Sequence, residues 1–256
     1  MSRNFELLQT LGKEGMLLDA AAVALIDQKI HRPASEPVAA KEPQLKLEPK
    51  EREELTKLAQ RIFLHPGTEA PRVVVFAATE PGNGCSSICA CAAELLAAQV
   101  SGSVCLVDAN LRNPGLHRQF AVENLYGLTD ALRGSEPLLK FARAMSRSNL
   151  WLVSCGSSAE AALPLLSSDG MRRRIAELRA AVDYVLIDAS AMNVSNDATA
   201  LAASADGLVM VLKANSSRRE TVRKTVHDLQ AAQVRVLGAV LNQRTFPIPE
   251  SIYNRL

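Results

Sequence analysis

The stretch 72-RVVVFAATEPGNGCSSICACAAELLAA-98 joins an apolar run to a glycine-bearing loop and then to a segment rich in alanine. The first run is rich in valine and apolar on both faces, which predicts a buried strand, and the alanine-rich segment predicts a helix. A strand, a glycine loop and a helix in this order form the setting of a phosphate-binding loop. Gly82 and Gly84 can adopt backbone angles closed to other residues, and the helix start offers N–H groups to an anion.

The loop departs from the phosphate-loop pattern G-x-x-x-x-G-K-[ST] at two positions. Thr79 stands where the pattern has its first glycine, and Cys85 stands where it has a lysine. That lysine reaches the terminal phosphates and offsets their charge during phosphoryl transfer, and cysteine has no cation to offer. Ser86 stands where a hydroxyl can ligate Mg²⁺. Taken alone, the loop is equally consistent with a tight turn that binds nothing.

Beyond this stretch, apolar runs and helical segments alternate along the chain. Further strands are predicted at residues 103–108, 150–155, 184–189, 207–213 and 234–242. Helices are predicted at residues 52–64, 86–100, 136–146, 168–182, 195–205 and 217–232. This alternation predicts an α/β fold with a doubly wound, mainly parallel sheet. Ligands of such sheets bind at the carboxyl ends of the strands.

Two aspartates end predicted strands and mark where chemistry is expected. Asp108 ends the run 104-VCLVD-108, and Asp188 follows the apolar run in 184-YVLIDA-189. Asp108 could hold a metal-bound water or activate a hydroxyl, and Asp188 matches a Walker B aspartate, which holds Mg²⁺ through water. Either residue could instead cap the next helix. Two such aspartates downstream of a glycine loop favour a nucleotide site.

Six stretches of sequence are together similar to one known family. Three carry motifs: 81-PGNGCSS-87 for Walker A, 106-LVDANLRNPGLH-117 for a second acidic motif and 186-LIDASA-191 for Walker B. The others are GLTDALRG (127–134), ADGLVMVLKANSSRRET (205–221) and VLGAVLNQRTFPIP (236–249). From these stretches, residues 53–256 resemble the cytoplasmic domain of bacterial tyrosine kinases (BY-kinases) of the CpsD/CapB type, which act in exopolysaccharide synthesis. The resemblance implies the three-layer α/β/α fold of P-loop NTPases related to MinD and ParA.

The resemblance also implies a site for ATP or ADP with Mg²⁺. The nucleotide-binding residues that it implies are Pro81, Gly82, Asn83, Gly84, Cys85, Ser86, Ser87 and Asn242. The metal ligands that it implies are Ser86, Asp108 and Asp188. The catalytic residues that it implies are Asp108, Asn110 and Arg112.

The sequence departs from the family pattern at the positions that carry the reaction. Besides Cys85, Asn110 replaces the second aspartate of D-x-D-x-R, and Walker B continues as 188-DASA-191 instead of D-x-P-P. Kinases of the family usually end in a tyrosine cluster, whereas Tyr253 is the only tyrosine in the C-terminal tail of this chain. These losses favour a pseudokinase, a nucleotide-binding scaffold that has lost phosphoryl transfer.

Two alternatives stay open. The chain is an active ATP-dependent protein-tyrosine kinase if another basic residue, Arg112, Arg218 or Arg219, replaces the lysine. It is a MinD-like or ParA-like positioning ATPase if it binds DNA or a membrane. A formal net charge of +2 and an aromatic content of 4% make nucleic acid an unexpected partner.

The region before the domain divides into two parts. Residues 1–30 predict a helical segment, and residues 31–52, with four prolines, predict an extended linker. The domain is therefore expected to occupy residues 53–256. The chain shows no signal peptide and no apolar run long enough to span a bilayer, and its five cysteines do not form a disulfide framework. These features predict a cytoplasmic protein.

The resemblance further implies a protein partner. BY-kinases of this type work with a membrane polysaccharide co-polymerase, which would recruit the chain to the inner face of the membrane. The predicted helix 52–64 places Glu54, Lys57 and Arg61 on one face. That face approximates the one through which subunits of the family pack into a ring, so a homo-oligomer is weighed against a solvated helix face.

Three cysteines lie close together as Cys85, Cys89 and Cys91. One helix cannot easily direct all three toward a single ion, so Cys89 and Cys91 are predicted to be small buried residues. Cys85 lies at the predicted start of a helix, where the pKa of a thiol is lowered. We therefore expect Cys85 to be reactive.

Overall fold

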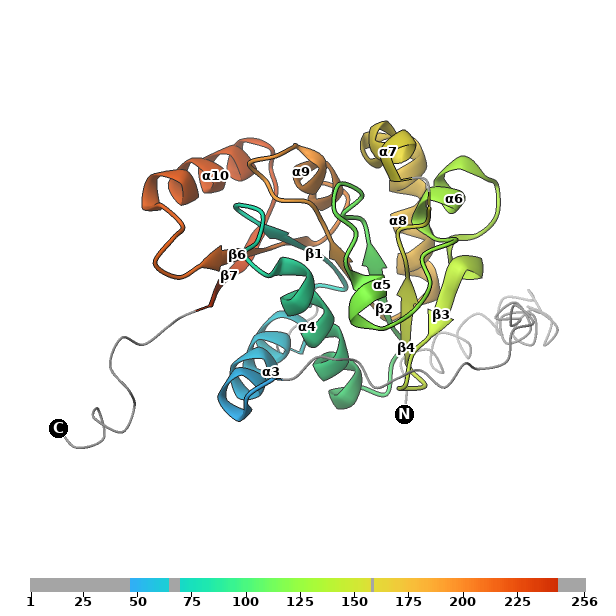
Figure 1. The fold of residues 1–256 in the computed structure, drawn as a ribbon, viewed down its shortest axis with the longest axis horizontal. Helices are drawn as coiled ribbons and strands as arrows, with labels where there is room; N and C mark the ends of the chain where they lie inside the picture. The colour runs from blue at the N-terminus through green and yellow to red at the C-terminus, as the bar shows by residue number, and fades with distance from the viewer. Residues whose placement is uncertain (1–46, 65–69, 158, 244–256) are drawn as a thin grey trace, which may run out of the picture. The chain divides into compact units, whose positions relative to one another are not determined.

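A computed structural model describes residues 47–64, 70–157 and 159–243 of the chain. The predicted helical segment 1–30, most of the predicted linker and Tyr253 lie outside the described residues. The described residues form a central sheet with helices on both of its faces (Figure 1). None of the helices in this described part has the length and apolar character of a transmembrane span.

Seven strands form one sheet in the order β3-β4-β2-β5-β1-β6-β7. The strands are β1 (Val73–Ala78), β2 (Val104–Asp108), β3 (Ala142–Ala144), β4 (Leu150–Val153), β5 (Tyr184–Asp188), β6 (Gly207–Lys213) and β7 (Val236–Asn242). Only β3 runs antiparallel to its neighbour, and all the other neighbouring pairs are parallel. The predicted doubly wound, mainly parallel sheet is confirmed.

Alternate residues of the central strands pack into two separate hydrophobic cores, one on each face of the sheet. In β1, Val73, Val75 and Ala77 face one core, and Val74 and Phe76 face the other. The first core is covered by α6 (Leu128–Arg133), α8 (Asp169–Ala181), α9 (Asp197–Ala202) and α10 (Arg219–Ala231). The second core is covered by α3 (Pro49–Phe63), α4 (Cys85–Gln99) and α5 (Leu116–Gln119). The domain therefore has the expected three α/β/α layers.

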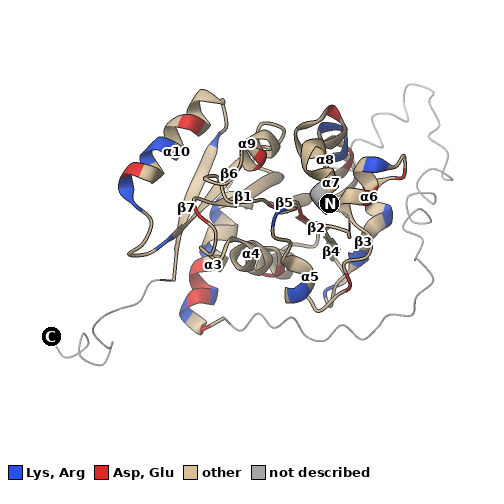
Figure 2. Cartoon of the chain, turned by 45° about the horizontal axis from the view of Figure 1, so that its top comes forward, with Lys and Arg blue, Asp and Glu red and all other residues tan. Residues whose placement is uncertain are grey.

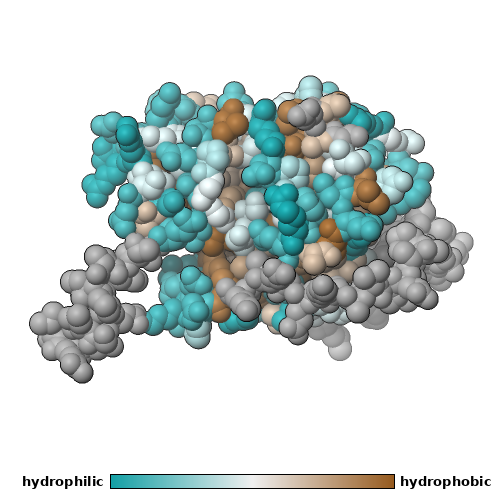
Figure 3. Space-filling model, viewed as in Figure 1, coloured by the Kyte–Doolittle hydropathy of each residue, from teal (hydrophilic) through white to brown (hydrophobic). Residues whose placement is uncertain are grey.

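Charge is distributed differently over these helices. Figure 2 shows Lys and Arg interspersed with Asp and Glu along α3 and α10, while α4 is almost without charge. Glu94 is the one charged residue within α4, which packs between the sheet and α3. On the face seen in Figure 3, hydrophobic residues form small separate areas within a mostly hydrophilic surface.

Helix α3 begins at Pro49, inside the segment that was predicted to be linker. Proline is tolerated in the first turn of a helix, where its missing N–H has no partner to lose. Glu48 caps this helix, and its own N–H donates to Glu51 Oε2 at 3.1 Å. The last proline of the linker therefore starts the helix and does not prevent it.

The helix predicted at residues 136–146 is wrong. One 3-10 turn, η1 (Leu138–Phe141), is followed directly by strand β3, whose residues Ala142 and Ala144 pair with Val153 and Trp151 of β4. The segment contains good helix formers, but it lies along the open edge of β4. Pairing with that edge overrides the local preference for a helix. Two shorter elements, α7 (Ala159–Ala162) and η2 (Leu163–Ser167), precede α8.

Asp206 ties the beginning of β1 to α8. Its Oδ2 accepts hydrogen bonds from the N–H groups of Arg72 at 2.7 Å and Val73 at 2.8 Å, and its Oδ1 lies 2.8 Å from Arg179. Partial burial acts to raise the pKa of Asp206, but the bonds from Arg179 and the two backbone groups outweigh it. The pKa of Asp206 therefore lies below its usual value.

We predict that Asp206→Asn lowers the free energy of unfolding by about 1–2 kcal/mol at pH 7, because charge-assisted bonds are lost at a partly exposed site. The folded pKa lies below the unfolded pKa, so this stability is present above the unfolded pKa and is lost as the pH falls through the folded pKa. Urea denaturation at a series of pH values measures the difference between wild type and variant. A difference that stays constant as the medium is acidified would contradict the assignment.

Candidate functional site

The site is organised by two aspartates at the carboxyl ends of neighbouring strands. The parallel register of β2 and β5 pairs Asp108 directly with Asp188, and both side chains are fully buried. Leu106 and Leu186, two residues before them, face the core beneath α4. Because side chains alternate along a strand, both carboxyl groups also point to the α4 side of the sheet.

Asp188 keeps one oxygen that no described group satisfies. Its Oδ2 accepts a hydrogen bond from Ser86 Oγ at 2.5 Å, whereas its buried Oδ1 has no hydrogen-bond partner among the described residues. Burial, and then the charge of Asp108, raise the pKa of Asp188 above its usual value, and Ser86 and Cys85 offset only part of this. A buried carboxylate oxygen beside a serine hydroxyl fits the oxygen ligands that Mg²⁺ requires.

Asp108 has a different environment, in which both of its oxygens accept backbone hydrogen bonds. The donors are the N–H groups of Asn110 at 3.3 Å, Gly115 at 3.1 Å and Leu116 at 3.0 Å. Burial raises the pKa of Asp108, and these three bonds lower it without cancelling the effect of burial. Asp108 thus folds residues 109–116 back toward the start of α4, and its oxygens are less available to a metal than those of Asp188.

The glycine loop presents a row of backbone donors. Gly82 and Gly84 have φ values of 81° and 80°, in the left-handed region that favours glycine. The backbone N–H groups of residues 82–87 form no hydrogen bonds with other described residues. Pro81, Gly82 and Ser87 are exposed, and Ser87 Oγ accepts a bond from Gln119 at 3.1 Å. The loop therefore has the geometry of an anion-binding turn.

Asn83 and Asn242 hold the loop in this shape. The buried Asn83 side chain donates to Thr79 Oγ1 at 3.1 Å, so this predicted ligand offers a nucleotide its backbone and not its amide. Asn242, at the end of β7, donates from Nδ2 to the carbonyl oxygen of Asn83 at 2.9 Å. The structure therefore brings Asn242, expected at the nucleotide from the resemblance, directly onto the loop.

The expectation that the helix start lowers the pKa of the Cys85 thiol is wrong. Only 8% of Cys85 is exposed, and its side chain lies close to Asp188 and to the backbone of Ala78. Burial, and then the charge of Asp188, raise the pKa of the thiol well above its usual value. The stabilisation of a thiolate by a helix start is a smaller effect than the loss of solvation beside a carboxyl group.

The remaining predicted catalytic residues, Asn110 and Arg112, have different hydrogen-bond partners. Asn110 Oδ1 accepts a bond from the N–H of Asn113 at 3.3 Å and closes a local turn. Arg112 Nε bonds Asp197 Oδ2 at 2.9 Å, and Ser195 donates to the same oxygen at 2.7 Å. The charge of Arg112, one of the predicted replacements for the lysine, is therefore directed to the start of α9.

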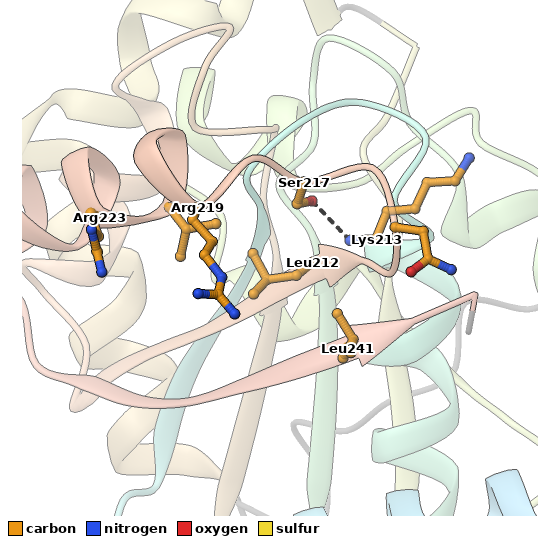
Figure 4. A pocket seen from close by; sticks show the side chains of 8 residues that line it. Leu212, Lys213, Ser217, Arg219, Arg223 and Leu241 are labelled. Carbon is orange, nitrogen blue, oxygen red and sulfur yellow. Dashed lines mark hydrogen bonds between the residues drawn. The ribbon is translucent and has the colours of Figure 1, made fainter. Parts of the chain in front are cut away.

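A hollow of about 370 Å³ lies between α10 and the ends of β6 and β7 (Figure 4). Its lining combines apolar and basic side chains: Leu212, Lys213, Asn215, Ser217, Arg219, Val222, Arg223 and Leu241. Leu241 directly precedes Asn242 in β7, and it is Asn242 that contacts the glycine loop. Arg219 was among the basic residues considered from the sequence, but Lys213 and Leu241 were not. The pattern of a β-strand does not show which of its ends borders a hollow.

Sequence reasoning also missed Arg118 on α5. Its Nη2 lies 3.9 Å from the point where a Cβ on Gly115 would be, and Ser86 Oγ lies 3.6 Å from that same point. The sequence shows that Arg118 lies in the segment that follows Asp108. It does not show that this segment folds onto Ser86, which is what brings the arginine near the loop.

Comparison with curated proteins gives clear matches, although no model of a known protein family matches the chain. Tyrosine-protein kinase YwqD of Bacillus subtilis is 32% identical over 162 residues, which cover 63% of this chain and 68% of that protein. Succinoglycan biosynthesis transport protein ExoP of Rhizobium meliloti is 32% identical over 180 residues, or 69% of this chain. The chain spans only 23% of the length of ExoP.

Solved structures agree with these matches. The kinase domain of VpsO has a TM-score of 0.68 at 27% identity, covering 77% of this chain and 98% of that chain. The chimerical protein CapA2B2 has a TM-score of 0.70 at 22% identity, covering 80% of this chain and 88% of that chain. A complex of McdA with ATP from Cyanothece gives 0.58 at 18% identity, covering 67% of this chain and 70% of that chain, and shows the fold alone. The predicted α/β P-loop fold is confirmed.

The environment of Cys85 predicts slow alkylation. We expect iodoacetamide to modify Cys85 of the native protein no faster than Cys105, because the pKa values of both buried thiols are raised. Peptide mass spectrometry at several reaction times measures both rates, and protein unfolded in urea gives the rates without burial. Selective modification of Cys85 in the native protein would contradict this environment.

The loop glycines predict a second result. Gly84→Ala should destabilise the protein more than Gly82→Ala, because a Cβ at residue 84 would collide with Asn242 Nδ2 and one at residue 82 has nothing within 4 Å. The left-handed backbone alone costs each variant about 1–2 kcal/mol, and the collision adds about 1–3 kcal/mol.

A double-mutant cycle isolates the collision. Asn242→Ala should destabilise the wild type, which loses the bond to Asn83, but should cost less or even stabilise in the Gly84→Ala background. Thermal unfolding of the four proteins measures the coupling. Equal losses for Gly82→Ala and Gly84→Ala would contradict the contact between Asn242 and the loop.

Proposed function

The chain belongs to the family of bacterial tyrosine kinases, and we propose that it binds ATP or ADP with Mg²⁺ as a pseudokinase of exopolysaccharide or capsule synthesis and export. One observation carries the proposal. At the position of the phosphate-loop lysine there is a buried thiol beside Asp188, while the serine, the carboxyl groups and the backbone donors of the site are in place.

Binding is supported by what the site retains. The N–H groups of residues 82–87 would hold the phosphates, and Ser86 with Asp188 would hold Mg²⁺. The hollow beside Leu241 has apolar walls for a base and basic side chains for an anion. Asp108 would keep residues 109–116 against the site through its three backbone bonds. Bound Mg²⁺ would supply positive charge to the phosphates.

Weak phosphoryl transfer is supported by what the site lacks. In kinases of this kind a cation offsets the charge that develops on the transferred group. Removing one comparable electrostatic contact to a transition state costs about 10²–10³ in kcat. Cys85 offers no such contact, and Asn110 has no carboxylate with which to accept a proton or bind a metal. Both replacements, Cys85 and Asn110, remove groups that would assist phosphoryl transfer, so both are expected to lower its rate.

The tyrosines also bear on the proposal. Tyr184 lies half-buried at the start of β5 and packs edge-on against Phe63 with ring centroids 5.9 Å apart. Tyr126 is 64% exposed and is available as an acceptor within the described residues. The tail tyrosine expected from the sequence, Tyr253, lies outside them.

The proposed partner is a membrane polysaccharide co-polymerase. ExoP, named as a succinoglycan biosynthesis transport protein, matches this chain over 23% of its own length. We infer that the chain acts at the cytoplasmic face of the membrane, recruited there by such a partner. Self-association into a homo-oligomer is the second assembly to test. Nucleic acid is a less suitable partner, because Arg223 and Lys224 of α10 alternate with Glu220 and Asp228 (Figure 2).

A nucleotide titration tests the proposal. We predict that Mg-ATP and Mg-ADP raise the melting temperature of the wild type, since a ligand at one hundred times its Kd adds about 2.7 kcal/mol of stability. Cys85→Lys should bind Mg-ATP more tightly than the wild type, and Cys85→Ala, which removes the thiol without adding a cation, should not. Calorimetry gives the three Kd values.

Two outcomes would contradict the proposal in different ways. If neither the wild type nor Cys85→Lys responds to nucleotide, the site does not bind nucleotide. If the wild type transfers phosphate from ATP to its own tyrosines, and Asp188→Asn abolishes the transfer, the chain is an active kinase of the family. Phosphotyrosine detection by mass spectrometry distinguishes an active kinase from a pseudokinase.

A further inference from the structure

The proposed site holds negative charge that no described cation within the loop offsets. Two buried aspartates lie side by side beneath the loop, and the phosphates of a nucleotide would bring more negative charge to the same place. A phosphate loop usually offsets this negative charge with its lysine, and Cys85 stands at the position of that lysine in this chain. Another cation is therefore needed if the terminal phosphates are to be held.

The basic residues singled out from sequence do not supply it. Arg112 is paired with Asp197 at 2.9 Å, and Ser195 bonds the same carboxyl oxygen. Arg219 lines the hollow between α10 and β7 (Figure 4). Arg218 immediately precedes α10 and belongs to the same end of that helix. In the part of the chain that the structure describes, no hydrogen bond joins any of the three to Ser86.

Arg118 is the basic side chain that the fold brings to Ser86. A methyl group placed on Gly115 would lie 3.6 Å from Ser86 Oγ and 3.9 Å from Arg118 Nη2, so the hydroxyl and the guanidinium flank the same point. The arginine is also close enough to Asp108 to lower its pKa. Arg118 is exposed, and its guanidinium forms no hydrogen bond or ion pair with another described residue.

The position of Arg118 follows from Asp108. The carboxyl group of Asp108 accepts the N–H groups of Gly115 and Leu116, which fixes the beginning of α5 next to the loop. Gln119, one residue after Arg118, donates to Ser87 at 3.1 Å and ties the end of α5 to α4. Both ends of the short helix are therefore anchored, and Arg118 lies between the anchors.

The glycine at position 115 is consistent with this placement of Arg118. Its φ of −135° is open to any residue, so backbone conformation does not explain the glycine. A Cβ at this position would lie at ordinary contact distances from both Ser86 and Arg118. A glycine therefore leaves the point next to the hydroxyl and the guanidinium free of a side chain.

We propose that Arg118 supplies, from α5, the cation that the loop lacks, and that it contacts the terminal phosphate groups of the nucleotide. The inference rests on the proposed nucleotide binding and names a residue of the same site. A guanidinium suits this role, because it stays charged and can donate two parallel hydrogen bonds to phosphate oxygens.

Calorimetric titration of Mg-ATP, Mg-ADP and AMP tests the proposal. Arg118→Gln should weaken Mg-ATP binding by at least about tenfold, which equals 1.4 kcal/mol, Mg-ADP by less and AMP not at all. Arg118→Lys should restore part of the loss because it restores the charge. Arg173→Gln is the matched control: Arg173 is also an exposed arginine without a described partner, but it lies on α8 at the opposite face of the sheet.

Gly115→Ala gives a test that does not depend on the arginine. The variant should fold like the wild type, since its Cβ meets nothing closer than 3.6 Å, yet it should weaken Mg-ATP more than AMP. Unchanged Mg-ATP binding by Arg118→Gln would overturn the role of Arg118 and leave nucleotide binding intact. Equal weakening of ATP and AMP would assign Arg118 a structural role. A wild type that binds none of the three ligands would overturn both proposals.

Discussion

The pairing of β2 with β5 forces two aspartates to lie side by side inside the protein, and the rest of the site follows from that constraint. Burying carboxyl groups is unfavourable unless each finds hydrogen bonds. Asp108 finds three backbone N–H groups, and in doing so folds residues 109–116 over the start of α4. Asp188 finds Ser86 and keeps one oxygen unsatisfied. Burial of the two carboxyl groups thus makes Asp108 on β2 a structural anchor and leaves Asp188 on β5 with an oxygen that a cation could satisfy.

The same constraint explains why Cys85 is tolerated. Burial and the neighbouring carboxyl group keep the thiol neutral, so it adds no charge to a place that already holds two acids. The loop keeps its shape through Asn83 and Asn242, which do not depend on the residue at position 85. In the proposed function, the absence of the lysine would therefore remove a charge from phosphoryl transfer while the loop keeps its shape. This separation between binding and transfer is what a pseudokinase requires, and Arg118 on α5 would keep the phosphates bound.

Much of this arrangement could be predicted from sequence, because it depends on local patterns. The valine-rich runs gave strands within two residues of those observed, and the strand-end rule placed Ser86, Asp108 and Asp188 together. The rest depended on partners distant in sequence. The segment 136–146 became an edge strand because β4 offers an unpaired edge, and the charge of Arg112 is taken by Asp197, 85 residues away. The raised pKa of Cys85 results from the burial of its side chain next to Asp188, and no sequence motif specifies where that side chain lies.

The most direct test of this account is a crystal structure of the wild-type chain with Mg²⁺ and ADP. The account predicts the β-phosphate on the N–H groups of residues 82–87, Mg²⁺ beside Ser86 and Asp188, and the Arg118 guanidinium turned toward the phosphate. A nucleotide bound elsewhere on the domain, or a phosphate contacted by Arg112 or Arg219 while Arg118 points to solvent, would contradict it.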